Sequence, residues 1–205
     1  MFKIRPCAPG DLDDLYHIAL MTGASGKDAS ALYRDPKLVG HIYAAPYALF
    51  APEFAFVAED GEGVAGYVVG AVDTAAFEDL LEDRWWPRLR PQYADPSAIP
   101  YEDWTADQLR SWQIHHPRRT SRRIAEPFPS HLHINLLPRL QGQGVGRRLI
   151  DTWLATISAM GSKGAHLGVN PDNLAAMHFY RALGWREPVL EKPPPKSVVW
   201  FAMNL

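Results

Sequence analysis

The sequence contains a single cysteine, Cys7, among its 205 residues. Because an intramolecular disulfide needs two cysteines, a disulfide framework is excluded, and we interpret Cys7 as a small core residue. The sequence also lacks an apolar run of the roughly 18 residues that a membrane-spanning helix needs. Residues 1–5 lead directly into a strand pattern instead of a signal peptide. We therefore expect a soluble, cytoplasmic protein with no membrane partner.

A strong excess of charge of one sign is also missing. The chain has 21 Lys and Arg against 23 Asp and Glu, which gives a net charge of −2. Because nucleic-acid binding depends on a clear excess of basic residues, we expect no nucleic-acid partner. The apolar share of 47% is sufficient for a real core. The length fits one domain over residues 1–205 that carries an insertion.

Two common phosphate-binding motifs are absent. A P-loop needs Gly-Lys followed by Ser or Thr, whereas residues 26–28 read Gly-Lys-Asp. The dinucleotide fingerprint G-x-G-x-x-G fails as well, because counting from Gly142 and Gly144 puts Arg147 at the last glycine position. A phosphate ligand held by either motif is therefore excluded.

Residues 136–161 nevertheless indicate a strand end, a glycine-rich turn and an amphipathic helix. Glycines alternate where the helix should begin, and glycine permits unusual dihedrals and close approach of a bulky anion. The first turn of a helix has unpartnered N–H groups and partial positive charge. Arg147 and Arg148 add cationic donors, so this stretch predicts a phosphate or pyrophosphate site. The helix should end at Gly161 and have one apolar face: Leu149, Ile150, Trp153, Leu154, Ile157 and Met160.

A second patterned stretch follows directly. A short strand is expected over residues 165–169, and then a loop in which Asn173 is placed to cap a helix. Apolar residues recur at i, i+3, i+4 and i+7 in that helix, which Gly184 should terminate: Ala176, Phe179, Tyr180 and Leu183.

The run Gln141-x-x-Gly144-x-Gly146 resembles the coenzyme A pyrophosphate loop of the GNAT superfamily of N-acetyltransferases. Taken alone, it is also compatible with an ordinary tight strand-to-helix turn. The run from Asn173 to Trp185 is similar to the second signature of that superfamily, N-x-x-A-x-x-h-Y-x-x-h-G-[FW]. With both signatures in the right order, the resemblance implies an α/β (α+β) fold: a mixed, mostly antiparallel central sheet flanked by helices.

The rest of the chain has patterns that agree with this fold. We expect the other strands at residues 2–5, 54–59, 64–73 and 131–136, and a last one at 197–204 after a stiff proline spacer at 193–195. Asp11 should cap a first helix, with Asp14 as its capping-box partner, and a second helical region should resume over 37–50. Gly66 and Gly70 should mark a bulge or a close backbone approach.

Residues 74–130 are too long for a simple connection and carry many aromatic and proline residues. We interpret them as a helical insertion, with short helices at about 75–83 and 104–115, that walls the acceptor side of the site. The alternative is a structural subdomain without substrate contact. The basic cluster within it is typical of a solvated face: Arg118, Arg119, Arg122 and Arg123.

The resemblance also implies roles for individual residues. A main-chain N–H near Leu136 or Leu137, at the end of the central strand, would stabilise the thioester oxygen. Tyr180 matches the acid that protonates the departing thiolate, although it could instead be a core aromatic. Acetyl-CoA, the implied co-substrate, would be bound by Leu136, Leu137, Gln141, Gly142, Gln143, Gly144, Val145, Gly146, Arg147, Asn173, Ala176, Phe179 and Tyr180.

The superfamily has no single motif for the general base. Asp73, at a strand end before the insertion, is the first candidate, and His133, on the polar face of the central strand, is the second. The alternative for His133 is a structural histidine. The pair His131-x-His133 offers two metal ligands without a third nearby, so we expect no metal.

A narrower resemblance covers most of the chain. Residues 32–49, the hairpin at 54–73 and the run Trp85-Trp86-Pro87 resemble the acetyltransferase-like domain at the C-terminus of animal O-GlcNAcase and its free-standing bacterial relatives. The resemblance implies an acetyl-CoA-dependent N-acetyltransferase that acts on a primary amine of a small molecule or peptide. The alternative is a catalytically weak module of the same fold that binds acyl-CoA or a protein. Homodimers are frequent in the superfamily.

Overall fold

The computed structural model describes residues 1–189 and 198–205. The expected proline spacer and the first residue of the expected last strand, Ser197, lie outside the described residues. No described helix is long and apolar enough to cross a membrane.

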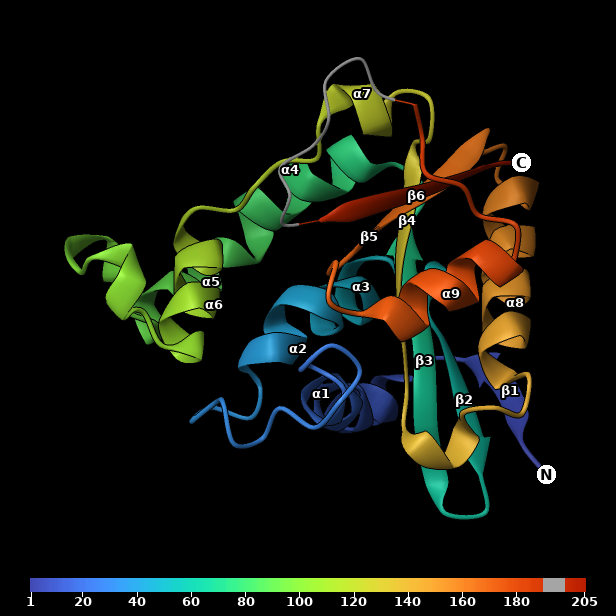
Figure 1. The fold of residues 1–205 in the computed structure, drawn as a ribbon, viewed down its shortest axis with the longest axis horizontal. Helices are drawn as coiled ribbons and strands as arrows, with labels where there is room; N and C mark the ends of the chain where they lie inside the picture. The colour runs from blue at the N-terminus through green and yellow to red at the C-terminus, as the bar shows by residue number, and fades with distance from the viewer. Residues whose placement is uncertain (190–197) are drawn as a thin grey trace.

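A six-stranded sheet forms the centre of the described structure, with strand order β1-β2-β3-β4-β5-β6 (Figure 1). Neighbouring strands are antiparallel except for the parallel pair β4 and β5. The predicted mixed, mostly antiparallel sheet is therefore confirmed. The strands are β1 (Lys3–Pro6), β2 (Phe56–Asp60), β3 (Gly63–Ala71), β4 (Ser130–Leu136), β5 (Gly164–Val169) and β6 (Val199–Asn204).

Strands β4 and β5 pair over only two positions, Ser130 with Ala165 and His131 with His166. Strand β4 continues alongside β3 as far as Leu136, whereas its ladder with β5 has already ended. The sheet therefore opens between the C-terminal halves of β4 and β5. Among the described residues, the backbone of β4 beyond His131 therefore has no strand partner on the β5 side, and Leu136 lies beside Gly146 at the start of the next helix.

Helices cover both faces of the sheet (Figure 1). The helices α1 (Leu12–Met21), α2 (Leu38–Tyr43) and α3 (Ala45–Phe50) lie on one face, and α8 (Val145–Ala159) lies on the other. Helix α8 approaches β3 closely, because a Cβ at Gly70 would lie 2.6 Å from the Trp153 ring. The predicted close approach at Gly70 is thus confirmed. At Gly66, the β2–β3 ladder shifts register, as a bulge requires.

The insertion extends from one end of the sheet (Figure 1). It holds α4 (Thr74–Arg84), α5 (Trp86–Leu89), α6 (Ala106–His115) and α7 (Arg122–Ala125). Both predicted insertion helices are present, whereas α5 and α7 were not predicted. The Trp85 indole N–H donates to the carbonyl of His41 at 2.8 Å, and α6 packs against α2, so the insertion is anchored to the α1–α3 layer.

The remaining elements are the helix α9 (Leu174–Ala182), whose second half approaches the start of α8 through Phe179, and several single turns of 3-10 helix. These turns are η1 (Pro9–Asp11), η2 (Pro52–Phe54), η3 (Arg90–Gln92), η4 (Pro96–Ala98), η5 (Tyr101–Asp103) and η6 (Pro138–Leu140).

Two expectations about side chains are wrong. Asp11 makes no capping bond to α1, because its carboxylate pairs with the Arg5 guanidinium at 2.6 Å and accepts the Ala8 N–H at 2.7 Å. Met160 does not belong to the apolar face of α8, since the helix ends at Ala159 and leaves that side chain exposed. Gly161, with φ of +81°, follows the end of α8 as predicted.

Candidate active site

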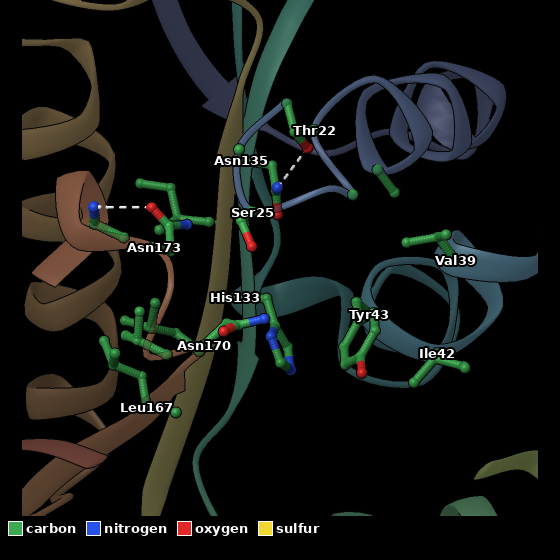
Figure 2. Close-up of a pocket in the computed structure, with 18 of the residues that line it drawn as sticks. Thr22, Ser25, Val39, Ile42, Tyr43, His133, Asn135, Leu167, Asn170 and Asn173 are labelled. Atoms are coloured by element: carbon green, nitrogen blue, oxygen red, sulfur yellow. Dashed lines mark hydrogen bonds between the residues drawn. The ribbon is translucent and has the colours of Figure 1, made fainter. Parts of the chain in front are cut away.

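A cavity of about 1750 Å³ lies where β4 and β5 separate. The glycine-rich loop and the start of α9 form one end, and the α1–α2 loop, α2 and residues of the insertion form the rest. Figure 2 shows side chains of the α1–α2 loop, β4 and α9 gathered around the same space. Ligand pockets for drug-sized molecules are typically about 300–1000 Å³, so this volume suits two substrates at once.

The glycine-rich loop presents backbone N–H groups at the start of α8. Gly142 and Gly144 have φ of +70° and +76°, and nothing lies within 4 Å of a Cβ built at either position. The N–H of Arg148 is the first to bond within the helix, to the carbonyl of Gly144. The N–H groups of the three residues before it thus have no acceptor inside the helix. This is the geometry that an anionic phosphate group needs.

The two arginines of this turn point in different directions. Arg147 lines the cavity, whereas the Arg148 guanidinium lies 4.7 Å from the centre of the Phe2 ring. The expectation that Arg148 serves the anion site is therefore wrong. Only Arg147 of this pair adds a cation to the cavity wall.

The glutamines of the loop support its conformation. The Gln141 side chain lines the cavity and donates from Nε2 to the carbonyl of Leu136 at 2.8 Å. The Gln143 side chain donates to the carbonyl of Arg139 at 2.8 Å and does not line the cavity. Gln141 therefore ties the loop to the end of β4, while Gln143 lies outside the cavity wall.

The end of β4 offers one of the two predicted backbone donors. The N–H of Leu137 donates to the carbonyl of Ala65 at 2.7 Å, so it belongs to the β3 side of the sheet. Because hydrogen-bond directions alternate along a strand, the N–H of Leu136 points to the opposite side, where the β5 ladder has ended. The structure thus assigns the cavity-facing donor to Leu136 and not to Leu137.

Helix α9 contributes the second signature to the same cavity. The Oδ1 of Asn173 accepts the Ala176 N–H at 3.1 Å and caps the helix, as predicted. Ala176 and Phe179 line the cavity, and a Cβ at Gly146 would lie 3.0 Å from the Phe179 ring. The absence of a side chain at residue 146 therefore lets the start of α8 approach Phe179, in the second half of α9.

Tyr180 is 7% exposed and lines the cavity. Its hydroxyl bonds to no other residue within 1–189 and 198–205. Burial raises the pKa of this phenol above its ordinary value, so the hydroxyl keeps its proton at neutral pH. The ring packs beside Trp185 and Phe201. Tyr180 is thus a core aromatic that also lines the cavity and keeps its hydroxyl proton.

Four side chains form a hydrogen-bonded chain, and three of them, His133, Tyr47 and His131, line the cavity. Nε2 of His133 lies 3.1 Å from the Tyr47 hydroxyl, which lies 2.9 Å from Nε2 of His131. Nδ1 of His131 lies 2.8 Å from the Thr74 hydroxyl, and this hydroxyl donates to the carbonyl of Pro129 at 2.7 Å. Sequence reasoning missed Tyr47, since it lies in an apolar helical run with no motif around it.

The carbonyl of Pro129 fixes the proton positions along this chain, because a carbonyl can only accept. Thr74 uses its one proton there and must accept from Nδ1 of His131. The other nitrogen of a neutral His131 then accepts from Tyr47, whose oxygen accepts from Nε2 of His133. Nδ1 of His133 is thereby left unprotonated on a side chain that lines the cavity.

Burial holds these histidines in their neutral form. It lowers the pKa of His133 to about 4 and that of His131 well below its ordinary value, with nearby His166 lowering both further. Burial likewise lowers the pKa of His166 to about 4. The tautomer assignment above therefore applies at neutral pH.

Asp73, the first candidate base, is not brought to the cavity. Its side chain is exposed and caps α4 by accepting the Ala76 N–H at 3.0 Å. Another acid of α4, Glu78, does line the cavity, and burial raises the pKa of its carboxyl. Its Oε1 accepts the Thr120 N–H at 2.9 Å. The sequence offered no signal for Glu78, because its approach to the cavity depends on how the insertion folds back.

Potential metal ligands do not converge in the described parts of the chain. Within residues 1–189 and 198–205, no three His, Cys, Asp or Glu side chains are grouped so that they could hold an ion. Three of the four ring nitrogens of the β4 histidines instead take part in the chain through Tyr47 and Thr74.

Comparison with known proteins agrees with this geometry. The model of the Acetyltransferase (GNAT) family matches residues 13–185. The chain therefore belongs to the GNAT family of acetyltransferases, which confirms the predicted superfamily.

Individual relatives extend the likeness over the whole chain. The crystal structure of SsHAT is 33% identical, covers 99% of this chain and 98% of that one, and has a TM-score of 0.90. Protein O-GlcNAcase of Rattus norvegicus is 25% identical over all 205 residues. The chain spans about a fifth of that relative's length (22%). The predicted likeness to O-GlcNAcase is thus confirmed.

A more distant structure shares the fold alone. Phosphinothricin acetyltransferase from Sinorhizobium meliloti, solved in complex with acetyl-CoA, is 14% identical and has a TM-score of 0.57. It covers all of this chain and 88% of its own.

Proposed function

We propose that this protein is an acetyl-CoA-dependent N-acetyltransferase that transfers the acetyl group directly to a primary amine of a small molecule or peptide. One observation carries the proposal. A cavity at the opening between β4 and β5 brings together the Leu136 N–H on the β5 side of the strand, the Tyr180 hydroxyl, His133 and the N–H groups of the first turn of α8. An acyl transfer needs an anion site, an oxyanion donor, an acid and a base, and these groups can supply all four.

The residues of the cavity fit acetyl-CoA as co-substrate. Its pyrophosphate suits the free N–H groups of Val145, Gly146 and Arg147, with the Arg147 guanidinium as counter-charge. Nδ2 of Asn173 remains available to the pantetheine arm, because only Oδ1 caps the helix. Acetyl-CoA supplies the acetyl group as a thioester, whose carbonyl oxygen gains charge when an amine attacks.

Three groups of the chain then handle charge and protons. The Leu136 N–H donates to the oxygen that gains charge; in other enzymes such a donor contributes about 10²–10³-fold to the rate. Nδ1 of His133 takes the proton that the attacking nitrogen loses. The Tyr180 hydroxyl gives its proton to the departing sulfur. One proton is accepted and one is given, so the two side chains restore their charge by proton exchange with water.

Neutral His133 suits this role because its nitrogen stays unprotonated over the physiological range. An amine of pKa about 10.4 is mostly protonated in water and must first lose one proton to the solvent, because an ammonium has no lone pair with which to attack. Once the neutral nitrogen bonds to carbon, its remaining protons become far more acidic. A base with a low pKa can therefore accept the proton at that stage. Tyr47, His131 and Thr74 act as positioning residues, since they keep Nδ1 of His133 free of a proton.

Calorimetric titration with acetyl-CoA, followed by thiol release over a panel of amines and peptides, tests the proposal. We expect micromolar binding and release that depends on the acceptor. Tyr180→Phe should lower kcat about 10²-fold or more and leave acetyl-CoA affinity unchanged. Binding without release by any acceptor would favour a binding module of the same fold. Absence of binding would reject the proposal.

A further inference from the structure

An arginine of the insertion lines the cavity and has no acidic partner among residues 1–189 and 198–205. Arg110, in α6, is half-buried, and its guanidinium makes three hydrogen bonds to described residues. Nε donates to the Tyr33 hydroxyl at 3.1 Å, and Nη1 donates to the Tyr43 hydroxyl at 2.9 Å and to Oε1 of Gln113 at 2.9 Å. All three acceptors are neutral. A guanidinium has five N–H donors, so the two on Nη2 remain for a ligand.

Other arginines of the insertion have carboxylates in reach. Arg90 pairs with Glu82 at 2.8 Å, and Arg119 pairs with Asp79. Asp107, in the same helix as Arg110, accepts the backbone N–H of Arg34 instead. Within residues 1–189 and 198–205, no carboxylate oxygen lies within 4 Å of the Arg110 guanidinium. A half-buried cation that is surrounded only by neutral dipoles is stabilised further by an anion.

The position of Arg110 connects it to the reacting groups. Its guanidinium carbon lies 5.2 Å from the centre of the Tyr43 ring, and that ring lies 5.4 Å from the His133 ring. Figure 2 shows Tyr43 and His133 facing the same space. The guanidinium therefore lies no farther from the His133 ring than these two separations combined. An amine at His133 and an anionic group at Arg110 can belong to one small molecule.

We propose that Arg110 binds a carboxylate of the acceptor, so that the acceptor carries its amine and a carboxylate a few bonds apart. This inference rests on the proposed function. The matching chemistry is a monoanion, since one uncompensated guanidinium with two remaining donors faces it. Both a free amino acid and the C-terminal residue of a peptide, with a side-chain amine, carry such a group.

Wild-type protein provides the first test. Thiol release is measured with glycine, β-alanine, 4-aminobutyrate and lysine, each beside its carboxamide. We expect kcat/KM about 10- to 100-fold higher for carboxylates, the range that corresponds to a charged hydrogen bond. Peptides that end in lysine, as free acid or amide, separate the two sources: preference for the free-acid peptide over lysine indicates a C-terminus. Equal rates for acids and amides would overturn the inference while leaving the proposed function intact.

Variants at residue 110 provide the second test. Arg110→Met should reduce the acid-to-amide ratio to about 1, and Arg110→Lys, which keeps the charge without the planar fork, should give an intermediate ratio. Arg123→Met removes an equal charge from an exposed position of the insertion outside the cavity, and the ratio should not change. If Arg110→Met does not fold, Arg110→Lys and the wild-type panel still decide.

A binding measurement separates the inference about Arg110 from the proposed acetyltransferase activity. Calorimetry with CoA-bound protein should detect the amino acids but not their carboxamides, and Arg110→Met should abolish that binding while acetyl-CoA affinity stays at the wild-type value. Amino-acid binding without thiol release would support Arg110 as an anion site while the proposed catalysis fails. If acids and amides bind alike, or if neither binds although acetyl-CoA does, the inference is wrong.

Discussion

The Tyr47 hydroxyl lies 3.1 Å from Nε2 of His133, although 86 residues separate the two in the sequence. Tyr47 belongs to α3 and His133 to β4, so the contact exists only once the α1–α3 layer has packed on the sheet. Through this contact, the proton arrangement fixed by the carbonyl of Pro129 reaches a cavity-lining side chain. The fold thereby sets which nitrogen of His133 is free.

Removal of this hydroxyl should impair catalysis without affecting coenzyme binding. We expect Tyr47→Phe to lower kcat about 10-fold or more, because the His133 tautomer is no longer fixed. The pH–rate profile should shift as well, a change that a purely structural role would not produce. Acetyl-CoA affinity should be unchanged by calorimetry. Tyr16→Phe is the matched control, since it deletes a 2.9 Å bond to Nδ1 of His41 outside the cavity.

Stability should decrease as the pH falls from about 6.5 to about 4. The folded state lowers the pKa of His131, His133 and His166, so the unfolded chain binds more protons in this window and protonation favours unfolding. The stabilising effect is fully present above the ordinary histidine pKa. Each such histidine contributes a slope of up to about 1.4 kcal/mol per pH unit.

Urea denaturation at several pH values measures this slope. His166, which is 1% exposed, provides the sharpest variant. His166→Gln should reduce the pH dependence of the unfolding free energy, whatever its effect on stability at pH 7. His17→Gln changes an exposed histidine and should leave the slope as in wild type. An unchanged slope in His166→Gln would contradict the assignment of this residue as a neutral buried group.

The glycine-rich loop predicts a specific loss of coenzyme affinity. Gly144→Trp places a bulky side chain where nothing lies within 4 Å, beside the free N–H groups of α8, so acetyl-CoA should bind at least about 10-fold more weakly. Gly63→Trp is the matched control, because Gly63 also has positive φ (+109°) and open surroundings but lies in the β2–β3 hairpin outside the cavity. Both variants place a side chain at positive φ, which costs on the order of 1–3 kcal/mol, so the comparison rests on coenzyme affinity and not on stability. Equal affinities in the two variants would remove the loop as the pyrophosphate site.

The sequence predicted elements whose signals are local. The succession of strands and helices along the chain follows from glycine positions and residue spacing. The caps of α8 and α9 follow from glycines and Asn173, which lie within one or two turns of the helix ends that they form. Strands that are neighbours in the sheet are also successive along the chain, so no strand pairs with one that is out of sequence order among the described residues. Arg148 was misplaced because a partner far away in the sequence, Phe2, competes for it. Asp11 was misplaced because its carboxylate pairs with Arg5, six residues away, instead of capping the helix.

The site was predicted less completely than the fold. Tyr47, Glu78 and Arg110 come from three helices whose meeting depends on how the insertion folds back on α2. Their roles depend on partners rather than on residue type: Arg110 is notable only because its hydrogen-bond acceptors are neutral. No local pattern contains that information. The distinction between Leu136 and Leu137 likewise depends on sheet register, which the sequence does not specify to one residue.

Asp73 should prove to be a helix cap. Asp73→Ala removes the acceptor for the Ala76 N–H and should cost about 1 kcal/mol of unfolding free energy. Asp73→Asn keeps an acceptor oxygen and should retain most of that stability. Both variants should show wild-type kcat and pH–rate profile, since the side chain is exposed and outside the cavity. A flat pH–rate profile in Asp73→Asn, against a limb at low pH in wild type, would instead restore this residue as the base.

Asn173 should contribute to both stability and coenzyme binding, and two substitutions can separate these effects. Asn173→Asp keeps an oxygen that caps α9 but loses the Nδ2 donor, so stability should be retained while acetyl-CoA affinity falls. Asn173→Ala should lose both the affinity and about 1 kcal/mol of stability. Asp73→Ala controls for the loss of a cap, because it deletes an equivalent bond in α4 without touching the cavity. If Asn173→Asp binds acetyl-CoA as tightly as wild type, the amide donor contacts no part of the coenzyme and Asn173 serves only to begin the helix.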